Sequence, residues 1–318
     1  MSPMHAPRAR VVTGPTDDTP PLPGQPAGRG PTVSIGLPVY NAERYLRESL
    51  DSLLAQTFCD FEVVVCDNAS EDATAAIAED YARRDPRVRV HRADRNHGLA
   101  WNWNRAFVLA SGRYFKWAAA DDVHLPRYLE RTLAEFQMRP DAVLVHSRTV
   151  EVDENGVAGP EVIKDVRTDG GDVAARFHEL TRKGWPCVDV FGLVRADVLA
   201  RTGLHGRYPR SDRALLAELG LHGRLVRVPE VLFHRREFAG RLSRSHDLTA
   251  RYAVFTGEPV PRRVWPTWRL VGGFAVALLR ATTTRRGLTR RDALRCVGSL
   301  SRSVWGYRRT LGRELLRR

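Results

Sequence analysis

The stretch VSIGLPVYN at residues 33–41, followed by FEVVVCDNAS at residues 61–70, decides the fold. Each begins with a dense run of β-branched and apolar residues, which is typical of a strand buried on both faces, and each ends in turn residues. Between them, apolar residues recur at helical spacing over residues 42–56, and Asn41 is available as the cap of that helix. A strand, a helix and a second strand in this order predict a right-handed βαβ unit with parallel strands.

The same alternation of strands and helices continues along the chain. The sequence predicts strands at residues 88–91, 114–118 and 142–150, helices near residues 71–84 and 99–110, and a further helix begun by Pro126. This pattern indicates the α/β class, with a mostly parallel sheet covered by helices on both faces. Such sheets bind ligands at the carboxyl ends of their strands, so the turns that contain Tyr40, Asp67 and Asp121 are expected to meet there.

Positive charge is concentrated at the C-terminal end. The net charge is +13, and residues 262–318 supply it with 15 Arg against Asp292 and Glu314, whereas residues 1–261 balance 35 basic with 35 acidic side chains. Two helices are predicted there, near residues 265–280 and 289–316, and the second is amphipathic. We expect residues 262–318 to contact an anionic membrane surface, with a helical appendage on the body or a dimer contact as alternatives. Nucleic acid is not expected, because no known binding motif accompanies the charge.

The remaining composition is that of a soluble globular protein, with 43% hydrophobic and 27% charged residues. Residues 1–31 contain 8 of the 19 Pro and no apolar periodicity, which predicts a disordered leader, and no secretory signal is recognisable. No apolar run reaches the ~20 residues of a membrane-spanning helix. We therefore expect a cytoplasmic protein, peripheral at the inner face of the cell membrane, with a catalytic domain at 32–245 (halves 32–150 and 151–245) and a basic tail at 246–318.

Several motifs, taken in order and spacing, resemble the family 2 glycosyltransferases of the GT-A fold over about residues 32–245. They are VSIGLPVYN, QT at 56–57, EVVVCDNASED at 62–72, NHG at 96–98, Asn104, YFKW at 114–117, Asp121-Asp122 and Pro126. The resemblance implies transfer of a sugar from a nucleotide diphosphate donor to an acceptor hydroxyl, in the synthesis of a cell-surface polysaccharide or glycolipid. The implied partners are that donor and a saccharide or lipid-linked acceptor.

The resemblance also implies roles for particular residues. Donor binding falls to Pro38, Tyr40, Asn41, Asp67, Asn96, Gly98, Asn104, Asp121 and Arg235. Tyr40 offers an aromatic face to a base, and Asp67 offers an acceptor to a pyrimidine imide N–H. Asp121 and Asp122 would bind Mg²⁺ or Mn²⁺, because paired carboxylates at a strand end suit a hard divalent cation.

The implied catalytic base is Asp212, at the start of a helix predicted at residues 212–221. It would take the proton of the acceptor hydroxyl as that hydroxyl displaces the diphosphate with inversion. Two alternatives assign simpler roles: Asp212 as a helix N-cap, and Tyr40 as an aromatic residue that closes the core.

The sequence departs from the family pattern at the acidic turn. Ala119 stands where family members usually carry the first Asp of an Asp-x-Asp-Asp motif, and Trp103 stands where many have Arg. Because this carboxylate is missing, a protein that binds a sugar nucleotide without turning it over is one alternative function. A nucleotidyltransferase on a similar fold is the other alternative, although its glycine-rich basic loop is absent after the first strand. Dinucleotide-binding, P-loop and nucleophile-elbow motifs are also absent.

Overall fold

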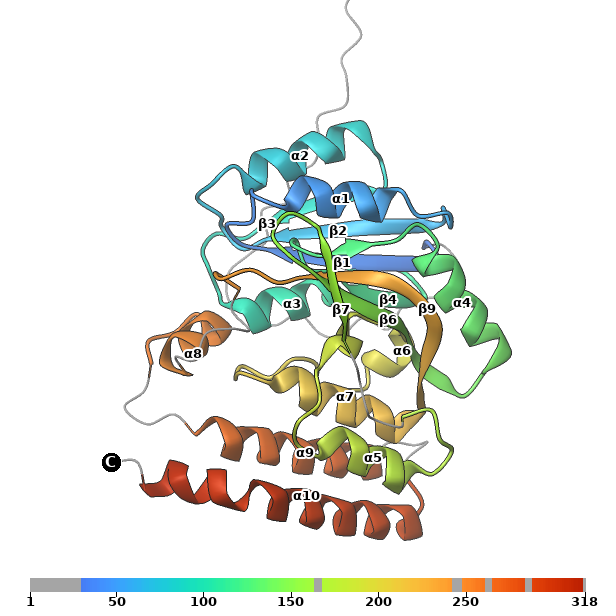
Figure 1. Cartoon of the computed structure of the whole chain (residues 1–318), viewed down its shortest axis with the longest axis vertical. Coiled ribbons are helices and arrows are strands. Elements are labelled where there is room, and N and C mark those ends of the chain that lie inside the picture. The colour runs from blue at the N-terminus through green and yellow to red at the C-terminus, as the bar shows by residue number, and fades with distance from the viewer. Residues whose placement is uncertain (1–29, 163–167, 242–247, 261–264, 284–287, 317–318) are drawn as a thin grey trace, which may run out of the picture.

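A computed structural model describes residues 30–162, 168–241, 248–260, 265–283 and 288–316 of the 318-residue chain. Figure 1 shows one sheet with helices on both faces, and two long helices, α9 (Pro266–Thr283) and α10 (Arg290–Leu316), stacked beyond the helices of one face. The predicted α/β class and the C-terminal helical appendage are therefore confirmed. The predicted leader, apart from residues 30 and 31, lies outside the described residues.

Nine described strands form a single sheet in the order β3-β2-β1-β4-β8-β6-β9-β5, and β7 pairs with β6. Strands β1, β2, β3 and β4 run in one direction. Strand β8 is antiparallel to both β4 and β6, so β6 and its parallel neighbour β9 run in the same direction as β1, which makes six strands in all. The sheet is thus mostly parallel, as predicted. The strands are β1 Val33–Val39, β2 Phe61–Asp67, β3 Val88–Arg92, β4 Tyr114–Trp117, β5 Val123–His124, β6 Ala142–Val152, β7 Ala158–Glu161, β8 Leu193–Arg195 and β9 Arg224–Arg236.

Helices cover the sheet in two groups, each with its own apolar cluster. Helices α1, α2 and α4 cover one face, and α3, α5 and α7 cover the other, where α9 and α10 pack on α7 and α5. The remaining helices are α1 Leu46–Leu54, α2 Thr74–Arg84, α3 Leu99–Val108, α4 Tyr128–Met138, α5 Val173–Thr181, α6 Ala196–Leu199, α7 Ser211–His222 and α8 Leu248–Thr256, with a 3₁₀ turn η1 at Val188–Phe191. No helix in the described ranges is both long and apolar enough to cross a bilayer.

Strand alternation explains why the first strands are buried on both sides. In β2, Val63 and Val65 join the cluster under α1 and α2, whereas Val64 and Cys66 join the cluster under α3. Because β1 lies between β2 and β4, with all three parallel, the turns that follow these strands emerge at the same sheet edge. This edge is where the candidate site forms.

Candidate active site

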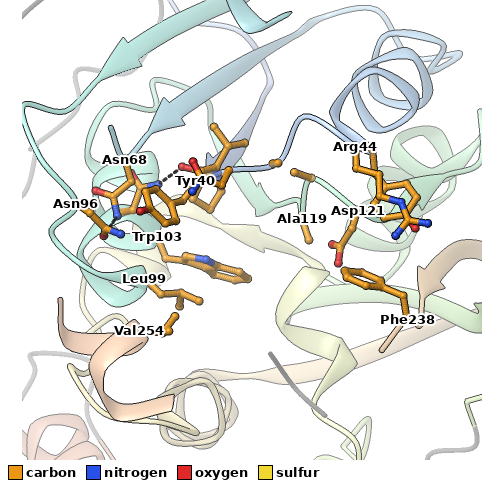
Figure 2. Close-up of a pocket in the computed structure, with 17 residues that line it drawn as sticks. Tyr40, Arg44, Asn68, Asn96, Leu99, Trp103, Ala119, Asp121, Phe238 and Val254 are labelled. Atoms are coloured by element: carbon orange, nitrogen blue, oxygen red, sulfur yellow. Dashed lines mark hydrogen bonds between the residues drawn. The ribbon is translucent and has the colours of Figure 1, made fainter. Parts of the chain in front are cut away.

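A cleft with a volume of about 450 Å³ opens at the carboxyl ends of the parallel strands. Its walls come from the turns after β1, β2, β3 and β4, from α3, and from segments around Phe238 and Val254. Figure 2 shows Tyr40, Asn68 and Asn96 at one end of the cleft and Asp121 with Phe238 at the other. Turns that are far apart in the sequence therefore meet at one site. The predicted donor-binding residues that line it are Pro38, Tyr40, Asn41, Asn96 and Asp121.

Tyr40 is held at the cleft by a turn that β1 shares with β2. Asn41 has a positive φ of 48°, a conformation that Asn tolerates better than most residues. Its backbone N–H donates to Ser70 Oγ over 3.0 Å, and its Oδ1 accepts from the backbone N–H of Glu71 over 2.9 Å. Asn41 therefore joins the two turns instead of capping α1, whose first residue is Leu46. The Tyr40 side chain is left 43% exposed at the cleft.

Asp67 ends β2 beside the cleft but does not line it. The side chain is fully buried, its Oδ1 accepts from the Ser70 backbone N–H over 3.0 Å, and its Oδ2 lies 3.4 Å from Arg92 Nε. Within the described part of the chain, Oδ2 makes no hydrogen bond. In this arrangement Asp67 shapes the turn that presents Asn68 to the cleft.

Two asparagine side chains build one end of the cleft. Asn68 Nδ2 donates to Asn96 Oδ1 over 2.8 Å, and Asn68 Oδ1 accepts from the His97 backbone N–H over 3.1 Å. Asn96 Oδ1 also accepts from the Gly98 backbone N–H over 2.9 Å. Gly98, with a φ of 88°, precedes α3 directly. The turn after β2 and the start of α3 are thus locked together.

Asn104, which was predicted to bind the donor, is engaged by the backbone of a neighbouring loop. Its side chain exchanges two hydrogen bonds of 2.9 Å with the backbone N–H and carbonyl of His205. It therefore ties α3 to the loop before α7 and does not line the cleft.

The acidic turn after β4 presents only part of its predicted carboxylate pair. Ala119, Ala120 and Asp121 line the cleft, and the Asp121 side chain is 22% exposed. Asp122 is fully buried. Its Oδ1 accepts from the Arg236 backbone N–H over 2.9 Å, and its carboxylate faces the Arg241 guanidinium at 3.1 Å. Burial raises the pKa of Asp122, and the charge of Arg241 opposes that rise.

Arg236 and Arg241 hold this turn, and neither was among the predicted site residues. The Arg236 side chain is only 2% exposed, its Nε donates to the Asp121 carbonyl over 3.0 Å, and its Nη2 lies 2.7 Å from Glu48 Oε2. Arg235, which was predicted to bind the donor, instead forms ion pairs with Glu151 and Glu237 at 3.2 and 2.6 Å. Arg235 and Arg236 are adjacent in β9 and so point to opposite sides of the strand, but burial along β9 does not alternate strictly, so alternation alone does not distinguish the two arginines.

The acidic turn fits a divalent cation through Asp121. A small hard cation is commonly held by one or two carboxylates together with substrate phosphates and waters, and Asp121 lines the cleft. Asp122 is engaged by Arg236 and Arg241, so its geometry argues against a role as second ligand. Among the described residues, no group of three or more His, Cys, Asp or Glu could hold a metal without the donor.

Asp212 lies at the start of α7, outside the cleft lining. Its Oδ1 accepts from the Arg213 backbone N–H over 2.9 Å. Burial raises the pKa of Asp212, while a hydrogen bond from Cys187 and the nearby Arg213 oppose the rise. Arg210, which directly precedes α7, has a positive φ of 73°. A left-handed conformation at a residue with a long side chain is strained, and such strain often accompanies functional sites.

Sequence comparisons point to one enzyme family. The family model described as glycosyl transferase family 2 matches residues 34–202, more than half of the chain. The putative glycosyltransferase EpsE of Bacillus subtilis (strain 168) is 34% identical over 142 residues, which are 44% of this chain and 51% of that protein. The hyaluronan synthase of Pasteurella multocida is 32% identical over 169 residues, which are 51% of this chain and 17% of the synthase. The matched stretches thus span about half or less of these relatives.

Solved structures share the fold at low sequence identity. S. aureus TarS 1–349 in complex with UDP-GlcNAc aligns with a TM-score of 0.55 and 17% identity, covering 86% of this chain and 81% of that chain. The mannosyltransferase PcManGT from Pyrobaculum calidifontis, in complex with GDP-Man and Mn²⁺, aligns with a TM-score of 0.50 and 14% identity, covering 92% and 86%. Both proteins are similar to this chain in their arrangement of strands and helices.

Proposed function

Because this chain belongs to glycosyl transferase family 2, we propose that it transfers a sugar from a nucleotide diphosphate donor to the hydroxyl of an acceptor. One observation carries the proposal: Tyr40, Asn96 and Asp121, which follow three different strands, line the same cleft at the carboxyl ends of the sheet. The aromatic face of Tyr40 and the amides beside it suit a base and a ribose at one end of the cleft, and the carboxylate of Asp121 suits a diphosphate at the other end.

The donor is held in this proposal by the turns of the parallel strands. The base stacks on Tyr40, while Pro38 and Asn41 shape the turn that carries it. Asp67, Gly98 and Asn104 contribute to donor binding indirectly, because they hold in place the backbone of the turns and the helix that border the cleft. Asp121 faces the diphosphate together with Mg²⁺ or Mn²⁺, and this cation would neutralise the negative charge that develops on the departing diphosphate. Asp122, Arg236 and Arg241 keep the Asp121 turn in place.

Asp212 is the proposed general base. Its raised pKa brings a carboxylate closer to the pKa that suits proton transfer near neutral pH. As the acceptor oxygen bonds to the anomeric carbon, the bond from that carbon to the diphosphate oxygen breaks. Asp212 takes the hydroxyl proton, and the diphosphate leaves with the bonding electrons. A single displacement of this kind inverts the anomeric configuration.

The acceptor in this proposal is a growing cell-surface polysaccharide or a lipid-linked saccharide. Relatives named hyaluronan synthase and chondroitin synthase support a polysaccharide product. We further infer that the enzyme works at the inner face of the cell membrane, where the positive charge of residues 262–318 holds it.

Calorimetric titration with nucleoside diphosphates and their sugars, with and without Mn²⁺, tests donor binding. Substituting Tyr40 with Ala should raise the Kd of the best ligand about five- to hundredfold, because an aromatic–base stack is lost. Tyr40→Phe should bind like the wild type. The matched control is Trp268→Ala on α9, which removes an aromatic of similar exposure, 41% against 43%. The proposal fails if no nucleotide binds in either condition.

A second candidate, a sugar-nucleotide-binding protein without turnover, is favoured by Ala119 and by the position of Asp212 outside the cleft lining. Release of nucleoside diphosphate in the presence of a saccharide acceptor separates the two. Turnover that is lost in Asp212→Asn while donor affinity is kept supports the transferase. The control is Asp197→Asn, whose carboxylate is 76% exposed. Binding without any turnover supports the second candidate.

A further inference from the structure

Helix α10 packs on the body through a face that mixes apolar and polar side chains. Its buried face carries Cys296, Ser299, Ser303, Tyr307, Leu311 and Glu314. Ser299 Oγ donates to the Ala174 carbonyl of α5 over 3.1 Å, and Glu314 accepts from the Thr267 backbone N–H of α9 over 3.1 Å. These contacts fix which face of α10 points outward.

The outward face is apolar. Leu294, Trp305 and Leu316 are spaced eleven residues apart, about three helical turns, and are 73%, 68% and 82% exposed. Val297 and Leu315 lie beside them, 51% and 58% exposed. Helical periodicity puts Leu294, Val297, Val304, Leu311 and Leu315 on one face of α10, and of these only Leu311 is buried. Large apolar side chains gathered on one solvent-facing helix surface mark an interaction site.

Arginine flanks this apolar stripe. All seven arginines of α10 are exposed, and Arg291, Arg302 and Arg309 run along one side of the stripe, with Arg308 on the other. Of the described residues, no carboxylate pairs with Arg290, Arg291, Arg309 or Arg313. The two acidic residues of α10 are turned elsewhere, since Glu314 is buried and Asp292 lies 3.5 Å from Arg295.

We propose that the outer face of α10 is a docking surface for an anionic lipid bilayer. Apolar side chains between basic flanks match a helix that lies in the membrane interface, with Leu294 and Trp305 entering the acyl boundary and the arginines facing lipid phosphates. A second copy of this chain fits poorly, because arginine rows would face arginine rows. A nucleic acid would use the arginines but would leave the apolar stripe exposed. This inference specifies the membrane partner in the proposed function, and it does not depend on the donor chemistry.

Vesicle co-sedimentation of the full chain, without donor, tests the surface. The probes are vesicles of phosphatidylcholine alone and of phosphatidylcholine mixed with phosphatidylglycerol. The wild type should bind only the mixed vesicles, and binding should weaken as salt is raised. Leu294→Ser/Trp305→Ser should weaken binding at least about tenfold, because two apolar side chains no longer leave water. Arg309→Gln/Arg313→Gln should weaken it about thirtyfold, since each basic residue near an anionic surface contributes about fivefold.

Two controls make the result specific. Met138→Ser on α4 removes an apolar side chain of 66% exposure from another surface. Arg83→Gln/Arg84→Gln on α2 removes two charges that already pair with Asp80. Both should bind mixed vesicles like the wild type, and all variants should keep the wild-type Kd for nucleotide. Four outcomes would each overturn the proposal. The wild type could fail to bind mixed vesicles, or the Leu294 and Trp305 double variant could bind them as well as the wild type does. The wild type could also bind single-stranded RNA in place of vesicles, or it could form dimers that the double variant dissociates.

Discussion

The guanidinium of Arg241 spans the carboxylate of Asp122, with Nη1 3.1 Å from Oδ1 and Nη2 3.2 Å from Oδ2. The carboxylate is fully buried, and the Arg241 side chain is 11% exposed. The contact joins the segment after β9 to the acidic turn after β4. The ion pair therefore ties together the two segments that lie on either side of Asp121. Because a buried charge without a partner is costly, the pair fixes the turn that faces the donor.

Removal of one partner should therefore cost stability. We predict that Arg241→Gln lowers the free energy of unfolding in urea by about 3–5 kcal/mol, the usual result when a buried ion pair loses one member. Adding Asp122→Asn to that variant should recover part of the loss, because no buried charge remains. The control is Arg201→Gln, whose pair with Asp197 is exposed and should contribute less than about 1 kcal/mol. Equal effects of the two Arg substitutions would contradict this assignment.

Ala119 can be used to test the orientation of the donor. The resemblance to family 2 implies that a carboxylate at this position helps to hold the ribose or sugar, and the Ala119 side chain lines the cleft. In Ala119→Asp, the Kd ratio between a 2′- or 3′-deoxynucleoside diphosphate and its ribose counterpart should rise about tenfold or more, because the added carboxylate accepts from a ribose hydroxyl. Repulsion between the new carboxylate and the diphosphate raises both Kd values equally, so it cancels in their ratio. Ala120→Asp, at the adjacent cleft position, should leave the ratio unchanged.

Most of the fold could be predicted from the sequence because the first strands and helices are locally determined. The apolar runs of β1 and β2 and the helical spacing in α1 each satisfy their own periodicity, and parallel βαβ units have one favoured handedness. The first residues of the helices were harder to predict. Asn41 has a side chain that can cap a helix or join two turns, and the contact with Ser70 and Glu71 that decides between these roles is formed across strands.

Long-range contacts also explain which site residues were missed. Arg241 lies about 120 residues from Asp122 in sequence, and no local pattern connects them. Which of Arg235 and Arg236 faces the acidic turn depends on the register of β9 against β6, where Val152 pairs with Arg236. A similar limit applies to α10, because the apolar period shows that the helix has an apolar face but not whether the body covers it.

Gly98 is predicted to be intolerant of any side chain. Its φ is +88°, and a Cβ there would lie 2.3 Å from the Gly257 backbone N and 2.5 Å from the Thr256 carbonyl carbon. Strain and overlap together should make Gly98→Ala less stable by about 2–5 kcal/mol in urea unfolding. Nucleotide affinity should fall as well, because Val254 of the displaced segment lines the cleft. Gly272→Ala on α9 is the control: a Cβ added there would meet no described atom within 4 Å beyond its chain neighbours and its own helix backbone, so the substitution should be neutral or stabilising.

His205 should make the protein sensitive to acid. Its ring is 4% exposed and meets Trp103 and Trp117 edge-on, at centroid distances of 5.1 and 4.7 Å. Burial lowers the pKa of His205 to about 3, whereas an unfolded His has a pKa of about 6.5. Between these values the unfolded state binds the proton and the folded state does not, so the free energy of unfolding falls as pH drops below about 6.5.

At pH 5 this single site should cost about 2 kcal/mol relative to pH 7. Burial also lowers the pKa of His91 and His124, which titrate in the same direction, so the wild-type loss should be larger. In His205→Phe the aromatic packing is kept and the titration is removed. The difference in unfolding free energy between pH 7 and pH 5 should therefore shrink by about 2 kcal/mol in this variant. An unchanged difference would mean that His205 is already protonated in the folded protein, which its packing between Trp103 and Trp117 argues against.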